Sequence, residues 1–102
     1  MGDFLKFATA LTSNQLLNEK YSKLVIAGKV DTPRGSKYAY GFMDGLTPDG
    51  VRFVGHGGGS AGMNGSMSIF PDSQYVVVVL ANMDPPAAGR VSQFIERRLP
   101  IK

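Results

Sequence analysis

The first third of the chain has the apolar spacing of two amphipathic helices. From Asp3 the apolar residues recur at positions i, i+3, i+4 and i+7, which predicts a helix capped by Asp3 and running to about Thr12. A second helix is predicted after Asn18, and Gly28 is expected to end it in a left-handed conformation. Residues 29–36, which contain a proline and a glycine, are then expected to form a loop.

The period changes to strict alternation after this loop. Residues 37–43 are expected to form a strand, with Tyr38 and Phe42 on one face. Residues 47–50 read Thr-Pro-Asp-Gly, which suits a type I turn that closes a hairpin onto residues 51–54. The glycine-rich residues 55–62 are predicted to extend this second strand.

A second hairpin and a last helix complete the pattern. Residues 63–70 alternate, residues 71–74 form a turn, and Tyr75–Ala81 is an apolar strand that the helices are expected to cover. Asp84 is expected to cap the last helix, with Pro85 in its first turn. The expected buried stripe of this helix consists of Val91, Phe94, Ile95 and Leu99.

This order of elements predicts an α+β domain. We expect an antiparallel sheet of about four strands, packed by two N-terminal helices and one C-terminal helix. The 102 residues, 43% of them hydrophobic, are enough for one small core, so residues 1–102 are expected to form a single domain.

Composition narrows the classes of function. The chain has no cysteine and one histidine, so we expect no disulfide, no metal site and no bound cofactor. The motif formed by Gly57, Gly59 and Gly62 resembles a dinucleotide fingerprint, but it leads into a strand instead of a helix. A cofactor of that kind is therefore not predicted.

Charge and hydropathy argue against two kinds of partner. The formal charge of +3 is spread along the chain, so no nucleic-acid partner is expected. The apolar run Val76–Ala81 is far shorter than the roughly 20 residues that a membrane-spanning helix needs. We expect no membrane partner. No secretory signal is predicted from the first residues.

The stretch Gly55–Gly62 contains the lone histidine, His56, and is the strongest candidate for a functional site. A strand without side chains usually occurs where another backbone or a ligand comes close. Ser60 and Ser66 are hydroxyl groups near His56 in sequence. No Ser-x-x-Lys, Gly-x-Ser-x-Gly or Tyr-x-Asn motif is present, so neither serine is favoured as a nucleophile.

Several features in order resemble the C-terminal part of the serine β-lactamase-like family, which includes class C β-lactamases, penicillin-binding DD-peptidases and esterases. They are His56-Gly57-Gly58, Gly59-Ser60-Ala61-Gly62, Val78–Asn82, the proline-rich start of the last helix, the Tyr40-Gly41-Phe42 strand and the first helix. The resemblance covers essentially the whole chain.

The resemblance assigns roles to five residues. His56 takes the Lys/His position of the family's Lys/His-x-Gly strand, and the N–H of Gly59 takes the place of one oxyanion-hole donor, so these two are the expected catalytic groups. Gly57, Gly58 and Ser60 are expected to bind substrate. Because Gly57 stands where the family often has a hydroxyl residue, the resemblance favours an esterase or peptidase over an efficient β-lactamase.

The resemblance also implies what the chain needs. The family's Ser-x-x-Lys and Tyr-x-Asn elements are not in this sequence, so we expect a C-terminal segment that is inactive alone and whose partner is the N-terminal part of the same protein. The alternative is a non-catalytic binding module that forms a homodimer through the exposed edge of Tyr75–Asn82. Family members are often periplasmic or secreted.

Overall fold

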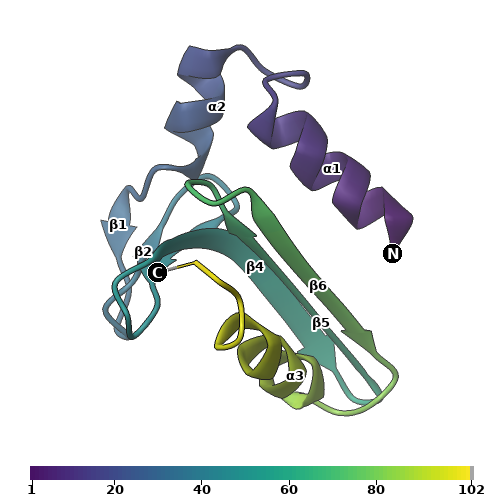
Figure 1. Cartoon of the computed structure of the whole chain (residues 1–102). Coiled ribbons are helices and arrows are strands. Elements are labelled where there is room, and N and C mark those ends of the chain that lie inside the picture. Colours follow the sequence, from purple (N-terminus) through teal and green to yellow (C-terminus); the bar gives the residue numbers. More distant parts are fainter. Residues whose placement is uncertain (102) are drawn as a thin grey trace.

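A computed structural model describes residues 1–101 as three helices and one antiparallel sheet of six strands in the order β1-β2-β3-β4-β5-β6 (Figure 1). The helices are α1 (Gly2–Thr12), α2 (Glu19–Ile26) and α3 (Ala87–Glu96). The strands are β1 (Val30–Asp31), β2 (Lys37–Tyr38), β3 (Met43–Leu46), β4 (Arg52–Ser60), β5 (Met63–Phe70) and β6 (Tyr75–Ala81). The α+β class with an antiparallel sheet is confirmed, with two more strands than expected.

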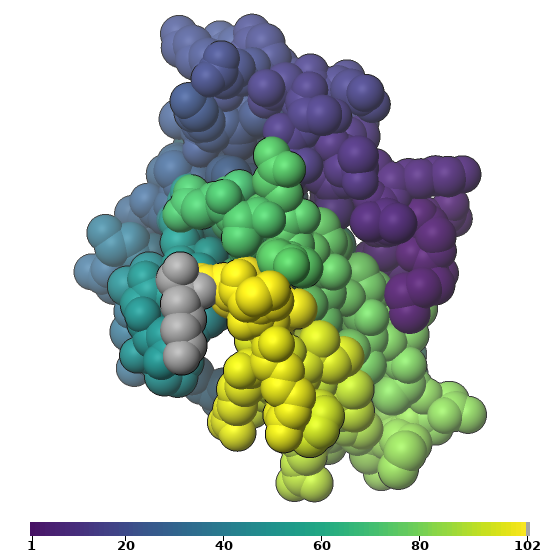
Figure 2. All heavy atoms as spheres, viewed as in Figure 1, coloured from purple at the N-terminus to yellow at the C-terminus, as the bar shows by residue number. Residues whose placement is uncertain are grey.

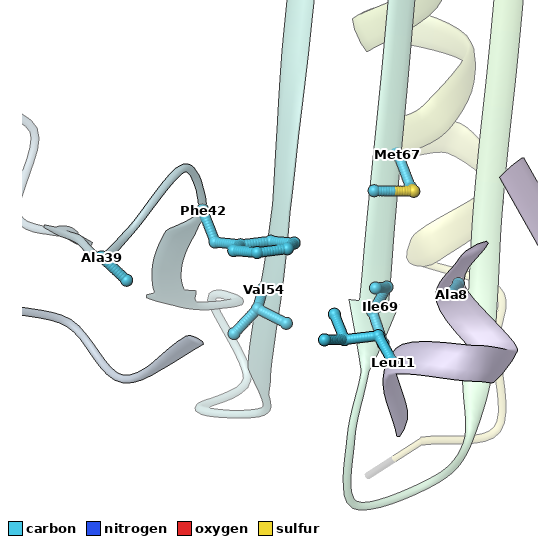
Figure 3. Close-up of a cluster of buried hydrophobic side chains, with 7 residues drawn as sticks. All are labelled: Ala8, Leu11, Ala39, Phe42, Val54, Met67 and Ile69. Atoms are coloured by element: carbon cyan, nitrogen blue, oxygen red, sulfur yellow. The ribbon is translucent and has the colours of Figure 1, made fainter. Parts of the chain in front are cut away.

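The helices lie on both faces of the sheet. The buried side chains of α1, Ala8 and Leu11, pack on one face against Val54 of β4 and Ile69 of β5 (Figure 3). The opposite face of β5 and β6 is covered by α3, which is coloured yellow in Figure 2. The full core cluster is Ala8, Leu11, Ala39, Phe42, Val54, Met67 and Ile69.

The two extra strands arise where the alternating pattern misleads. Gly41 has a φ of 87°, and the N–H of Ala39 donates to the carbonyl of Phe42 at 2.7 Å, so the chain turns between β2 and β3. The expected single strand over residues 37–43 is therefore wrong. Because of this turn, Ala39 and Phe42 are both buried, although alternation had placed them on opposite faces. The expected loop over residues 29–36 contains β1.

The helix ends agree with the sequence at Asn18 alone of the four expected caps, Asp3, Asn18, Gly28 and Asp84. Asn18 caps α2, since its Oδ1 accepts from the N–H of Tyr21 at 3.0 Å. Asp3 is not a cap. It lies in the first turn of α1, where its negative charge interacts favourably with the positive end of the helix dipole. Gly28 is not left-handed. A Cβ there would stand 2.4 Å from the Cβ of Lys37, so close packing requires the glycine.

The last helix buries a different face from the one expected. Val91, Phe94 and Ile95 are exposed, whereas Ala88 and Ser92 are buried against the sheet. Small residues face the sheet here because α3 lies close to β5, where the N–H of Ala88 reaches the side chain of a strand residue. The expected apolar stripe is wrong for these three residues, and Leu99 is half-buried.

The turns of both predicted hairpins are confirmed, although the first strand of the first hairpin is β3 and not residues 37–43. The first turn is closed by the N–H of Gly50, which donates to the carbonyl of Thr47 at 2.9 Å. The second is closed by the N–H of Gln74, which donates to the carbonyl of Phe70 at 2.8 Å. Within residues 1–101, no helix combines the length and the hydrophobicity that crossing a bilayer requires.

An ion pair fastens the end of α2 to the sheet. Arg52 donates to Asp44 from Nε at 2.8 Å and from Nη2 at 3.1 Å, and its Nη2 also reaches the carbonyl of Ile26 at 3.3 Å. The N–H of Gly28 donates to the same carboxylate at 2.9 Å. The hydrogen bond from Arg52 is the largest effect that holds the pKa of Asp44 below its usual range.

We expect Asp44→Asn to lower the free energy of unfolding by about 1–2 kcal/mol, because it removes a partly buried charge-assisted pair. Since the folded pKa of Asp44 is lowered, the stabilisation is complete above the unfolded pKa and is lost as pH falls through the folded pKa. Urea unfolding of both proteins should therefore show a constant gap at neutral pH that closes below about pH 4. Glu19→Gln, which removes the exposed pair with Lys23, should leave stability nearly unchanged.

Candidate functional site

The second half of β4 has a strand on one side only. β3 pairs with β4 as far as Met43, which lies opposite Gly55, whereas β5 accompanies β4 to Ser60. Among the described residues, no strand therefore pairs with the other edge of β4 from His56 onward. This free edge, residues 56–60 of β4, contains all five predicted site residues, and all five are exposed.

The register fixes which backbone groups point to the free edge. The carbonyls of Met63 and Gly65 lie toward β4, at 3.2 and 3.3 Å from where a Cβ of Gly59 or Gly57 would stand. The carbonyl of Gly58 also points to β5, because it accepts from the side chain of Asn64 at 2.9 Å. Since successive peptide groups of a strand point in opposite directions, the N–H groups of Gly57 and Gly59 face away from β5.

The glycines of β4 differ in what surrounds them. A Cβ on Gly55 would stand 1.9 Å from the carbonyl oxygen of Met67, and one on Gly59 would stand 2.6 Å from the Cγ of Pro85. Packing therefore requires these two glycines. At Gly58, in contrast, no atom of the described chain lies within 4 Å of the Cβ position. Close packing does not explain the missing side chain at Gly58.

An open groove of about 530 Å³ runs across this part of the sheet. Its floor is the β4 stretch from His56 to Ser60 together with β5, and Phe4 of α1 and Leu80 of β6 stand at its sides. The groove is accessible, and its lining is mainly apolar with a few polar groups, as is usual for small-molecule sites.

His56 uses both nitrogens of its ring. Its Nδ1 lies 2.6 Å from the carbonyl oxygen of Gly57, and its Nε2 lies 3.1 Å from the hydroxyl of Tyr38. The two rings meet edge to face, with centroids 6.0 Å apart. Sequence reasoning missed Tyr38, because an alternating strand pattern gives no sign of a partner two strands away.

Two further residues, also missed from the sequence, hold the far end of the site. Asn64 bridges β4 and α3, since it donates to the carbonyl of Gly58 and accepts from the N–H of Ala88 at 2.8 Å. Asp84 is not the cap of α3 as expected. Its carboxylate accepts from the N–H of Gly62 at 2.6 Å and so holds the turn between β4 and β5.

The serines near His56 are poorly placed to act as its nucleophilic partner. Ser66 pairs with Gly57, so its side chain lies on the other face of the sheet from that of His56. Ser60 shares a face with His56 but is four residues farther along β4, about 13 Å at the usual rise per residue.

No set of three or more histidine, cysteine or acidic side chains is close enough to hold a metal ion within residues 1–101. A second hollow, of about 450 Å³, lies between the β3–β4 hairpin and the end of α3 (Figure 2). Its lining includes Phe53, Leu99 and Ile101 and none of the predicted site residues.

Comparison with known proteins shows the family to which the chain belongs. The sequence profile of the Beta-lactamase family matches residues 1–100, so the chain belongs to that family. The crystal structure of a penicillin binding protein from Bacillus halodurans is similar, with a TM-score of 0.86 and 28% sequence identity over 96% of this chain. No curated protein matches the sequence.

The predicted resemblance to the serine β-lactamase-like family is therefore confirmed, and the chain is a relative of serine hydrolases. It spans 30% of the length of the Bacillus halodurans protein. The roles of His56, Gly57, Gly58, Gly59 and Ser60 remain predictions.

Proposed function

We propose that this chain is the C-terminal part of a β-lactamase-like serine hydrolase, which transfers the acyl group of an ester, amide or β-lactam to its nucleophile and then to water. The chain supplies the His-x-Gly strand on the substrate side of the active site. The nucleophile and its base come from the N-terminal part of the same protein, and residues 1–102 are inactive alone.

The observation that carries this proposal is the open space at Gly58. A glycine inside a strand lowers stability relative to a residue with a side chain, and no neighbouring atom requires one here. A substrate that binds the free edge, residues 56–60 of β4, and extends over the face of the sheet that carries His56 would occupy the space that a side chain at Gly58 would fill.

The direction of the Gly59 N–H supports the role of an oxyanion-hole donor. This group faces the free edge, and Pro85 packs against the residue on the side of α3, so the strand is fixed before substrate binds. A fixed N–H aimed at a developing oxyanion is worth about 3–4 kcal/mol of transition-state stabilisation. His56 stands next to this edge and orients the substrate through its ring or through the Gly57 carbonyl.

Covalent labelling tests the division of roles. A complete protein that includes the N-terminal part should be acylated by a fluorophosphonate or a β-lactam, whereas residues 1–102 should show only background labelling, because loss of the nucleophile costs roughly 10⁶-fold in rate. Labelling of the isolated chain that disappears in Ser60→Ala or Ser66→Ala would contradict the proposal. A Ser-x-x-Lys motif in the residues encoded before Met1 is the matching expectation from sequence.

One observation favours a second candidate, a module that associates with itself. Within the described chain β6 lies at the edge of the sheet and pairs with β5 alone, and Tyr75 and Leu80 on it are exposed. An apolar edge strand offers unpaired backbone groups to another chain. We propose that, without an N-terminal part to cover it, residues 75–82 pair with a second copy.

Sedimentation and amide exchange test this association. We expect a concentration-dependent dimer, with the amides of Val76 and Val78, whose N–H groups face away from β5, gaining protection as the dimer forms. Leu80→Lys or Leu80→Pro should prevent the dimer, because Leu80 is exposed, its N–H faces away from β5, and a charge or a proline on an edge strand opposes pairing. A monomer at all concentrations would exclude the self-assembly module.

A further inference from the structure

The hydrogen bond between Tyr38 and His56 spans the width of one strand. Tyr38 is the last residue of β2 and pairs with Met43 of β3, which in turn pairs with Gly55 of β4. Because β3 begins at Met43, it has no residue opposite His56. The ring of Tyr38 can therefore pass the end of β3 and reach the imidazole at 3.1 Å.

The two contacts of His56 define the proton positions on its ring. A backbone carbonyl can only accept a hydrogen bond, so Nδ1 must carry a proton in order to bind the carbonyl of Gly57. In the neutral ring Nε2 is then an acceptor, and the hydroxyl of Tyr38 is the group that donates to it. The Gly57 carbonyl therefore selects the tautomer, and the hydroxyl of Tyr38, which can donate or accept, serves as the donor to Nε2.

The hydrogen bond from His56 Nδ1 to the carbonyl of Gly57 restrains the peptide group that joins Gly57 to Gly58. The carbonyl of Gly57 points to the free edge, and the N–H of Gly58 points to β5. Glycine residues have the widest range of backbone conformations, and on the side of these glycines that faces away from β5 no strand of the described chain restrains the peptide groups. The imidazole holds the exposed carbonyl that no neighbouring strand of the described chain binds.

We propose that Tyr38 is a positioning residue of the site. It holds the His56 ring in the orientation in which Nδ1–H binds the Gly57 carbonyl, and through the ring it fixes the peptide of Gly57 and keeps the N–H of Gly59 directed at the free edge. With both ring nitrogens bound, His56 orients the strand and does not serve as the general base. The catalytic meaning of this positioning rests on the proposed hydrolase function, whereas the tautomer does not.

The single histidine makes the test direct. Long-range ¹H–¹⁵N spectra of ¹⁵N-labelled chain should show, for the neutral ring, a protonated Nδ1 and an unprotonated Nε2. In Tyr38→Phe the ring loses one neutral hydrogen bond and lies less often against the Gly57 carbonyl, so the ratio of the Nδ1–H to the Nε2–H tautomer should fall by roughly 3- to 10-fold. Tyr40→Phe removes an exposed hydroxyl two residues away and should leave the ratio unchanged.

The outcomes separate the two levels of the proposal. A wild-type ring with the proton on Nε2, or a ratio unaffected by Tyr38→Phe, would overturn the positioning role even if the variant itself were poorly folded, since the wild-type spectrum stands alone. In an active complete protein, Tyr38→Phe should lower kcat by roughly 3- to 10-fold with little change in KM. An unchanged kcat would overturn the catalytic part. A complete protein that cannot be acylated would refute the hydrolase function and leave the tautomer result intact.

Discussion

Gly55→Ala is expected to unfold the domain or to destabilise it severely. The added Cβ would stand 1.9 Å from the carbonyl oxygen of Met67 and 3.1 Å from the Cα of Ser68. Both are backbone atoms of β5, so no rotamer change relieves the overlap, and the central pair of strands must separate. Overpacking usually costs about 1–3 kcal/mol, and we expect the upper end or more here, which lowers Tm by at least about 12 °C.

Thermal and urea unfolding measure this effect, and Gly58→Ala is the matched control. It adds the same methyl group three residues farther along β4, where nothing in the described chain lies within 4 Å. Its stability should equal or slightly exceed that of the wild type, because alanine restricts the unfolded chain more than glycine does. Equal losses in Gly55→Ala and Gly58→Ala would show that the β4–β5 register is wrong.

The parts of the fold that the sequence predicts depend on local chemistry. The turn at residues 47–50 needs a proline and a glycine at fixed positions, and Asn18 caps a helix with its own side chain. Each of these features is complete within a few residues. The turns of the two hairpins and the start of α2 could therefore be predicted without any knowledge of tertiary contacts.

The features that could not be predicted depend on contacts between distant residues. The alternating pattern from residue 37 to residue 43 does not show that Gly41 adopts a positive φ, because glycine fits a strand and a turn equally well in sequence. Asp84 has the sequence of a helix cap, but its carboxylate binds the N–H of Gly62, 22 residues away. In α3, close contact with β5 overrides the apolar periodicity.

The candidate site shows the same division. His56 and the glycines after it are visible in the sequence, because a strand with so few side chains is unusual. Tyr38 and Asn64 cannot be recognised as site residues in the sequence, because the register of β2, β3, β4 and β5 brings them to the site. The sequence also cannot separate Gly55, which packing requires, from Gly58, which it does not.

The open space at Gly58, in contrast to Gly55, leads to the largest functional effect that we expect. In a complete, active protein, Gly58→Val should keep or increase stability, because valine favours strands and the space at this position is open. The same side chain would enter the groove between His56 and Leu80 and displace a substrate from the free edge. We expect kcat/KM to fall by roughly 100-fold, the loss that a displacement of about 1 Å can cause, with Gly58→Ala intermediate.

Gly89→Ala separates this effect from the mere addition of a side chain. Gly89 also has no described atom within 4 Å of its Cβ position, but it lies in α3, on the opposite face of the sheet from the groove. Alanine there should raise stability by up to about 1 kcal/mol and leave kcat/KM unchanged. If Gly58→Val were as active as Gly89→Ala, substrate would not lie along the free edge, because a valine in its path would be tolerated. A stable but inactive Gly58→Val would instead mean that the bare strand serves the ligand and not the fold.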